Sequence, residues 1–282
     1  MFHPHDGRPV KVHPYRRMMS FLIRDRGGAV VYFEQQLDLT RTLPWLAAQG
    51  RAGGPPPHLF HLVLHSLATV LHERERLNRF TVGHRTYQRN GVFLSFAAKK
   101  AMSDDAPLAT VKRRFDRGET FAQVVAAVSG EVDGARSPKL SHIDRELSVL
   151  LKLPGLLLAL LLRFLRILYA IGLAPRSLVD TDPMYTSAFL ANLGSVKLDA
   201  AYHHLYEHGN CPLFVTIGKT ADVPAVENGK LIARPTLTLR FTYDERVEDG
   251  LYCARSLTLL QQRIEDPASW IADAREDEGR AA

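Results

Sequence analysis

The sequence of 282 residues has only two cysteines, Cys211 and Cys253. Two cysteines cannot form the disulfide framework that stabilises many small secreted domains. The chain also begins without the charged and then apolar leader that directs secretion. We therefore expect a cytoplasmic protein in a reducing compartment.

The excess of positive charge is small, because 36 Lys and Arg residues face 30 Asp and Glu residues, for a formal net charge of +6. Acidic residues are spread through the chain, so this balance favours anionic small molecules such as CoA, phosphates or lipid head groups, and does not indicate nucleic acid. Apolar residues make up 46% of the sequence, enough for the core of one large or two small domains. Collagen, coiled coil and wholesale disorder are excluded.

No apolar stretch is clean enough to predict a membrane span. The strongest candidate, residues 147–173, is interrupted by Lys152, Arg163 and Arg166, and each such charge costs about 2.5 to 3.5 kcal/mol at a helix centre on insertion scales. A helix packed in the core or between subunits, an interfacial helix and a lid over a lipophilic substrate all remain open. With a membrane we expect at most weak peripheral contact through this segment.

The loop over residues 49–57, rich in Gly and Pro, is too short to separate domains, so the patterns along the chain predict one domain that includes the Leu-rich segment. Residues 1–14, rich in His, Pro and Gly, predict a loose arm, and residues 271–282 a frayed tail. Apolar periodicity predicts helices over 58–78 and 247–264, and strands over 29–37, 81–87, 92–98, 185–192, 212–219 and 231–243. Asn90-Gly91 is a hairpin signal between the second and third of these strands. Glu227-Asn228-Gly229-Lys230 predicts a turn between the last two.

Helix 58–78 carries a pair of histidines, His61 and His65, at the i, i+4 spacing of metal ligands. No carboxylate or cysteine stands at a position that would complete a site. The sequence therefore favours the interpretation that these histidines flank the buried face of the helix and do not bind a metal.

The most informative motif is Asp244-Glu245-Arg246-Val247-Glu248-Asp249-Gly250, which ends a predicted strand and opens a helix that runs through Ala-Arg-Ser-Leu to Glu-Asp-Pro. It resembles the Asp-His-Arg-Val-x-Asp-Gly signature of the 2-oxoacid dehydrogenase E2 acyltransferases. Residues 16–18, 71–78 and 189–194, the last reading Phe-Leu-Ala-Asn-Leu-Gly, are similar to further elements of that family in the same order. Residues 212–219 are closer to its chloramphenicol acetyltransferase branch. The resemblance covers about residues 15–270 as a single domain, with a Leu-rich helical insertion at about 140–180.

The resemblance implies a mixed α/β fold of the chloramphenicol acetyltransferase type, a central mixed sheet with flanking helices, assembled as a homotrimer with active channels between subunits. It implies an acyl thioester donor such as CoA and an acceptor that the sequence does not identify. No lipoyl attachment segment and no metal site are expected.

The resemblance also implies the site residues. In the family, a histidine of the motif is the general base, a serine of the Ser-Asn-Leu-Gly strand stabilises the oxyanion, and the motif's aspartate orients the loop. Here the base position holds Glu245 and the serine position Ala191, while Asp249, Asn192 and Thr216 are retained. A glutamate is a weaker base than a histidine, because its ordinary pKa is about two units lower. Burial could raise the pKa of Glu245, and like-charge repulsion from Asp244, Glu248 and Asp249 could add to this, with Arg246 acting in the opposite direction.

A second candidate is the run His203-His204-Leu205-Tyr206-Glu207-His208. If this loop approaches the channel, His203 or His204 could supply the missing imidazole, or His204 and His208 could join Glu207 around a metal. Ordinary loop histidines are the favoured interpretation.

Three functions compete on these residues. The first is a stand-alone acyltransferase with its chemistry rebuilt around Glu245 and Asp249. The second is a non-catalytic relative that binds an acyl or CoA-like ligand or scaffolds an assembly. The third is a lipid-surface protein in which the Leu-rich insertion dominates.

Overall fold

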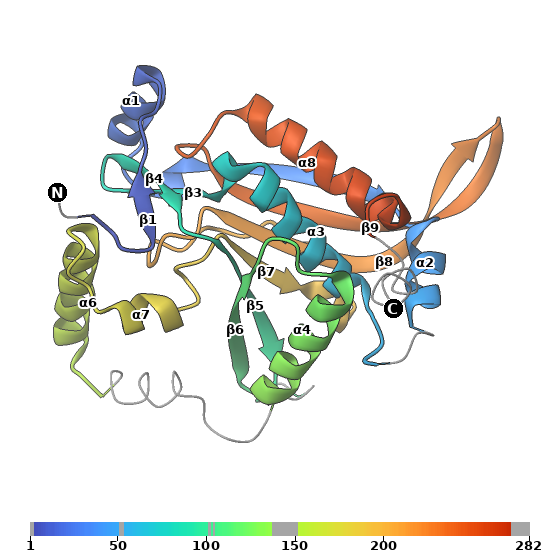
Figure 1. The fold of residues 1–282 in the computed structure, drawn as a ribbon, viewed down its shortest axis with the longest axis horizontal. Coiled ribbons are helices and arrows are strands. Elements are labelled where there is room, and N and C mark those ends of the chain that lie inside the picture. The colour runs from blue at the N-terminus through green and yellow to red at the C-terminus, as the bar shows by residue number, and fades with distance from the viewer. Residues whose placement is uncertain (1–2, 51–53, 101–102, 104, 137–151, 272–282) are drawn as a thin grey trace, which may run out of the picture.

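The structure is a computed structural model that describes residues 3–50, 54–100, 103, 105–136 and 152–271. A six-stranded mixed sheet forms its centre (Figure 1). The strands, in spatial order, are β2 (Val30–Asp38), β9 (Lys230–Asp244), β8 (Leu213–Glu227), β7 (Ala188–Asn192), β5 (Val92–Lys99) and β6 (Leu108–Phe115). β7 is parallel to both of its neighbours, and the other pairs are antiparallel. The predicted mixed α/β fold class is confirmed.

The helices are α1 (Pro14–Leu22), α2 (Thr42–Gln49), α3 (Leu59–Glu73), α4 (Phe121–Arg136), α6 (Gly155–Ala170), α7 (Arg176–Thr181) and α8 (Gly250–Glu265). Short 3-10 turns cover Gly27–Ala29, Glu75–Asn78, Leu193–Val196 and Pro267–Ser269. Figure 1 shows α3, α4 and α8 along one face of the sheet, and their apolar side chains form one core cluster with it.

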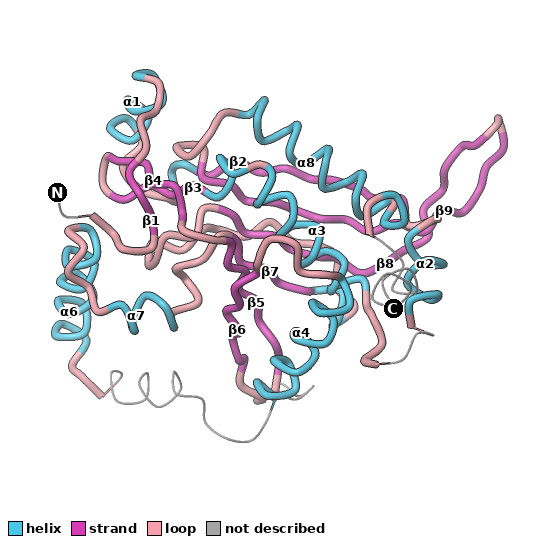
Figure 2. The backbone as a smooth tube through the Cα atoms, in the orientation of Figure 1, coloured by secondary structure: helices cyan, strands magenta, loops and turns pink. Residues whose placement is uncertain are grey.

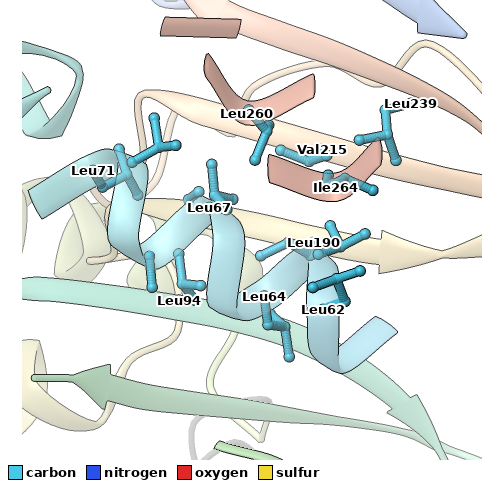
Figure 3. Close-up of a cluster of buried hydrophobic side chains, with 14 of the residues drawn as sticks. Leu62, Leu64, Leu67, Leu71, Leu94, Leu190, Val215, Leu239, Leu260 and Ile264 are labelled. Atoms are coloured by element: carbon cyan, nitrogen blue, oxygen red, sulfur yellow. The ribbon is translucent and has the colours of Figure 1, made fainter. Parts of the chain in front are cut away.

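The core follows from the period of two in the strands. Leu190, Val215 and Leu239 come from three adjacent strands, are fully buried and point toward the helices. Figure 3 shows them beside Leu67 of α3 and Leu260 of α8. The residues that alternate with them, including Ala191, Thr216 and Arg240, therefore face the opposite side of the sheet.

β8 and β9 form a long hairpin that extends past the rest of the sheet (Figure 2). Glu227 pairs with Lys230, so Asn228 and Gly229 form the two-residue turn, with φ angles of 51° and 73°. Positive φ at both central residues is the geometry that an Asn-Gly turn adopts most easily. The turn predicted between these strands is confirmed.

The predicted hairpin at Asn90-Gly91 is wrong. The preceding strand β4 (Arg85–Arg89) belongs to a separate three-stranded sheet with β1 (Gly7–Pro9) and β3 (Arg79–Val82), whereas β5 belongs to the large sheet. Gly91, at φ 96°, turns the chain from one sheet into the other. The predicted strand 81–87 is itself a hairpin of β3 and β4, because Gly83 at φ 59° reverses the chain.

The N-terminal arm is ordered over part of its length, so its prediction as loose is wrong there. β1 pairs with β4, and the Asp6 carboxylate forms an ion pair of 3.2 Å with buried Arg89. Residues 1–14 show no apolar periodicity because this attachment is polar.

The predicted insertion holds α6 and α7 in its described part, and both lie to one side of the large sheet in Figure 1. Lys112 Nζ in β6 donates to the backbone oxygens of Val179 and Asp182, at 2.7 and 3.1 Å, and ties the end of α7 to the sheet. In the described ranges, no helix combines the length and apolarity needed to cross a membrane. Residues 137–151 and the predicted tail from 272 onward lie outside the described residues.

Candidate active site

The motif occupies the junction between β9 and α8. β9 ends at Asp244, and Asp249 caps α8 by accepting a hydrogen bond of 2.8 Å from the Tyr252 backbone N–H. This hydrogen bond is the main cause that lowers the pKa of Asp249, and the nearby charge of Arg16 acts in the same direction. An aspartate is well suited to this position because its carboxylate accepts from the free N–H groups of the first turn.

Asp244 and Arg246 form a buried ion pair within the motif. Arg246 donates through Nε and Nη2 to the two carboxylate oxygens of Asp244, at 2.9 and 2.7 Å. Burial alone lowers the pKa of Arg246, but hydrogen bonding to Asp244 and its charge outweigh burial and raise it. Arg26, whose pKa burial lowers, lies 3.8 Å from the same carboxylate.

Glu248 is also paired. Its carboxylate lies 3.0 Å from Arg79 and 3.7 Å from Arg76. Asp244 and Glu248 therefore each face a cation, and Asp249 caps α8, so the like-charge repulsion that the sequence predicts around Glu245 is largely offset.

Glu245 differs from these three carboxylates. Its backbone N–H donates to the Ala29 oxygen at 2.9 Å, and its carbonyl accepts from Arg16 Nη1. The side chain is half-buried and forms no hydrogen bond or ion pair with any described residue. Glu245 therefore has a fixed backbone and a carboxylate that is available to another molecule.

The second group of predicted residues lies on β7 and β8. Ala191 is directly opposite Thr216 in the parallel ladder, and the Thr216 hydroxyl donates to the Ala201 carbonyl oxygen at 2.5 Å. Asn192 accepts a hydrogen bond of 3.2 Å from the Ser195 N–H and caps the 3-10 turn. Ala191 has no hydroxyl and the hydroxyl of Thr216 is already bonded, so neither offers a free donor.

One chain does not bring the two groups together. Thr216 pairs with Arg240 on β9, and Glu245 lies five residues beyond Arg240 in the direction of that strand. At about 3.4 Å per residue, this places Glu245 about 17 Å from Thr216.

The predicted histidine loop lies along the sheet face between these groups. The His203 ring stacks on Phe214 of β8 at 3.9 Å between centroids, and its carbonyl accepts from Thr242 of β9. Burial lowers the pKa of His203. His204 is exposed and stacks on His203 at 4.4 Å.

The two remaining members of that loop have other partners. Glu207 accepts hydrogen bonds of 2.8 Å from the backbone N–H groups of Arg26 and Gly27, and His208 Nε2 lies 2.6 Å from Asp182. The described residues include no group of three side chains arranged to hold a metal ion. The loop therefore brings histidines near the sheet face but does not gather a metal site.

The histidines of α3 support the interpretation from the sequence. His61 and His65 are both buried, and burial lowers the pKa of each to about 4. His61 Nδ1 accepts from the His58 backbone N–H at 2.9 Å, which closes the first turn of the helix.

The role of Arg16 at the site is visible only in the structure. Arg16 donates a hydrogen bond to the carbonyl of Glu245, and its charge lowers the pKa of Asp249. Helix α1 is therefore connected to the motif through Arg16. The Arg-Arg-Met match at residues 16–18 pointed to this element without indicating its contact.

Comparison with known proteins matches the part of the chain that contains the motif. The profile of the family described as 2-oxoacid dehydrogenases acyltransferase (catalytic domain) matches residues 188–272. A probable dihydrolipoyllysine-residue succinyltransferase component of the 2-oxoglutarate dehydrogenase complex from Schizosaccharomyces pombe is 38% identical over 64 residues, 22% of this chain and 14% of that protein. The corresponding component from Cupriavidus necator is 37% identical over 54 residues, 19% of this chain and 13% of that protein. The match thus spans about one seventh of these relatives.

Solved structures extend the likeness to nearly the whole chain. A dihydrolipoamide acetyltransferase from Azotobacter vinelandii has a TM-score of 0.60 at 19% identity, covering 92% of this chain and 93% of that one. A chloramphenicol acetyltransferase has a TM-score of 0.54 at 13% identity, covering 92% and 98%. The resemblance predicted from the motifs is confirmed, and the chain has the fold shared by these acyltransferases.

Proposed function

We propose that this chain, which has the fold of the E2 and chloramphenicol acetyltransferases, binds an acyl thioester such as acyl-CoA and transfers the acyl group with Glu245 as general base. The observation that carries the proposal is the carboxylate of Glu245, which has no partner among the described residues although the other three acidic side chains of the motif are engaged. It occupies the position at which the related signature has its histidine.

The proposed reaction is direct acyl transfer. Glu245 accepts the proton of a thiol or hydroxyl acceptor as that atom attacks the thioester carbonyl carbon. The tetrahedral intermediate then collapses, the carbon–sulfur bond breaks, and the departing thiolate takes the proton back. Asp249 and Arg16 would act as positioning residues, because they contact α8 and the Glu245 backbone.

We further propose that the working unit is a homotrimer. Glu245 lies about 17 Å along the strands from Thr216, so a channel containing both groups needs Asn192 and Thr216 from a neighbouring chain. His204, exposed on the same sheet face, would line this channel. Light scattering tests the assembly, and a monomer at micromolar concentration would refute the shared channel.

Turnover is expected to be slow. Ala191 offers no hydroxyl and Thr216 donates to Ala201, and loss of one oxyanion donor typically lowers the rate by about 10² to 10³. The test is thiol release from acetyl-CoA with dihydrolipoamide as acceptor, comparing wild type with Glu245→Gln. Glu227→Gln, at the exposed end of the β8–β9 hairpin, is the matched control. Fast turnover that persists in Glu245→Gln would show that the catalytic centre lies elsewhere.

The missing hydroxyl also favours a second candidate, a non-catalytic relative that binds an acyl or CoA-like ligand or scaffolds an assembly. Calorimetric titration with CoA separates the two. Binding without turnover, even in an Ala191→Ser and Glu245→His double variant, would favour the ligand-binding or scaffold role.

A further inference from the structure

Helix α6 presents an apolar surface that no described part of the chain covers. Leu156, Leu160, Phe164 and Ile167, here called the α6 apolar face, are between 53% and 73% exposed. They recur every three or four residues and so lie along one side of the helix. Solvent-exposed apolar side chains gathered in this way mark a surface that contacts another molecule.

The opposite side of the helix is less exposed, and the helix contacts the body through its last turn. Leu158, Leu161 and Leu165 are partly buried there. Near the end of the helix, the buried Tyr169 donates from its hydroxyl to Asp6 Oδ1 at 2.9 Å, and its ring packs against Tyr185 at 4.7 Å. Tyr169 lies on the side of the helix opposite the apolar face, so its contacts orient that face outward.

The charged residues of the helix and of its flanks up to Asp180 are all cations. Residues 152–179 contain four cations, Lys152, Arg163, Arg166 and Arg176, and no Asp or Glu. None of the four forms a hydrogen bond or ion pair with a described residue. A second copy of this face would bring like charges together, whereas anionic lipid head groups would neutralise them.

The dimensions agree with a helix that lies along a membrane. α6 has 16 residues, or about 24 Å at 1.5 Å per residue, less than the roughly 30 Å hydrocarbon core.

We infer that α6 binds the surface of an anionic bilayer, with its apolar face between the acyl chains and its cations at the head groups. This inference does not depend on the proposed acyl transfer. Binding is reversible and sensitive to salt, because one short helix buries few side chains and part of the attraction is electrostatic.

The experiment is flotation of the full chain with two kinds of vesicle, phosphatidylcholine alone and phosphatidylcholine with phosphatidylglycerol. A triple variant, Leu156→Gln, Leu160→Gln and Phe164→Gln, removes the apolar face while keeping helix-forming residues. Val226→Gln with Leu231→Gln is the matched control, because these side chains are 72% and 76% exposed on the β8–β9 hairpin. Circular dichroism establishes that each variant is folded.

Wild type and the hairpin control should float with the anionic vesicles, and the triple variant should not. Each of Arg163→Gln and Arg166→Gln should weaken binding about fivefold and reduce its dependence on salt. The inference is overturned if folded wild type does not float, if the triple variant floats equally well, or if binding is the same on neutral vesicles. Dissociation of an oligomer by the triple variant, without lipid binding by wild type, would instead assign the face to a second copy.

Discussion

Acidification from pH 7 to pH 5 should destabilise the fold through two histidines of α3. His61 and His65 are 5% and 7% exposed, and the pKa of each lies at about 4 in the folded chain. Burial is the main cause for both. The charge of His58 adds to it at His61, and the charges of Arg263 and Arg113 add to it at His65. The Nδ1 atom of His65 is buried and has no hydrogen-bond partner among the described residues.

The direction of the effect follows from the lowered pKa values. The unfolded chain takes up a proton at each histidine near pH 6.5, whereas the folded chain does so only near pH 4. The stability that the two neutral rings contribute is fully present above pH 6.5 and is lost as the pH falls toward 4. At about 1.36 kcal/mol per pH unit, each histidine lowers the free energy of unfolding by about 2 kcal/mol at pH 5 and by about 3 kcal/mol at pH 4. Together they remove a large part of a typical stability of about 5 to 15 kcal/mol.

Urea unfolding followed by circular dichroism at pH 7, 6 and 5 measures this loss. His65→Gln keeps a polar side chain without the titrating ring, so the variant should lose about 2 kcal/mol less than wild type between pH 7 and pH 5. His204→Gln, in the exposed loop, should follow the wild-type curve. If His61→Gln and His65→Gln both show the wild-type loss, the buried neutral state assigned to these rings is wrong.

Two further perturbations test the packing around the candidate site. Asp244→Ala leaves the buried guanidinium of Arg246 without its ion-pair partner, and should lower the free energy of unfolding by about 3 to 5 kcal/mol in urea titrations; a loss below about 1 kcal/mol would contradict the pairing. Gly194→Ala adds a Cβ that meets the carbonyl oxygen of Gly218, and should cost about 1 to 3 kcal/mol. Its control is Gly130→Ala in α4, where nothing lies within 4 Å and a gain of about 0.5 to 1 kcal/mol is expected in thermal unfolding.

The fold was predictable from the sequence because several weak motif matches occur in one order. Local signals located most elements, including the β8–β9 turn at Asn228-Gly229. These local signals gave wrong predictions where the same short sequence occurs in two kinds of structure. Asn90-Gly91 is a turn, but the flanking strands β4 and β5 do not pair, because the two edges of β4 are taken by β3 and by β1, which is distant in sequence. Likewise, the composition of residues 1–14 could not reveal that Asp6 would meet Arg89.

The sequence predicted which residues belong to the candidate site, but it did not predict their partners or the distances between them. Four neighbouring acidic side chains suggested mutual repulsion around Glu245, but Arg76 and Arg79, distant in sequence, approach Glu248. The separation of Thr216 from Glu245 is a property of strand register, which the motifs do not encode.

The structure also explains why the motif match survives where the catalytic residues differ. Asp244 and Arg246 form the buried pair, Val247 is fully buried, and Asp249 caps α8. These matching residues each support the fold. The two positions that differ, Glu245 and Ala191, have side chains without hydrogen bonds to described residues, so they can change without disturbing it. The likeness in sequence is therefore carried by residues that build the acyltransferase fold, and measurements on Glu245 and Ala191 must decide the chemistry.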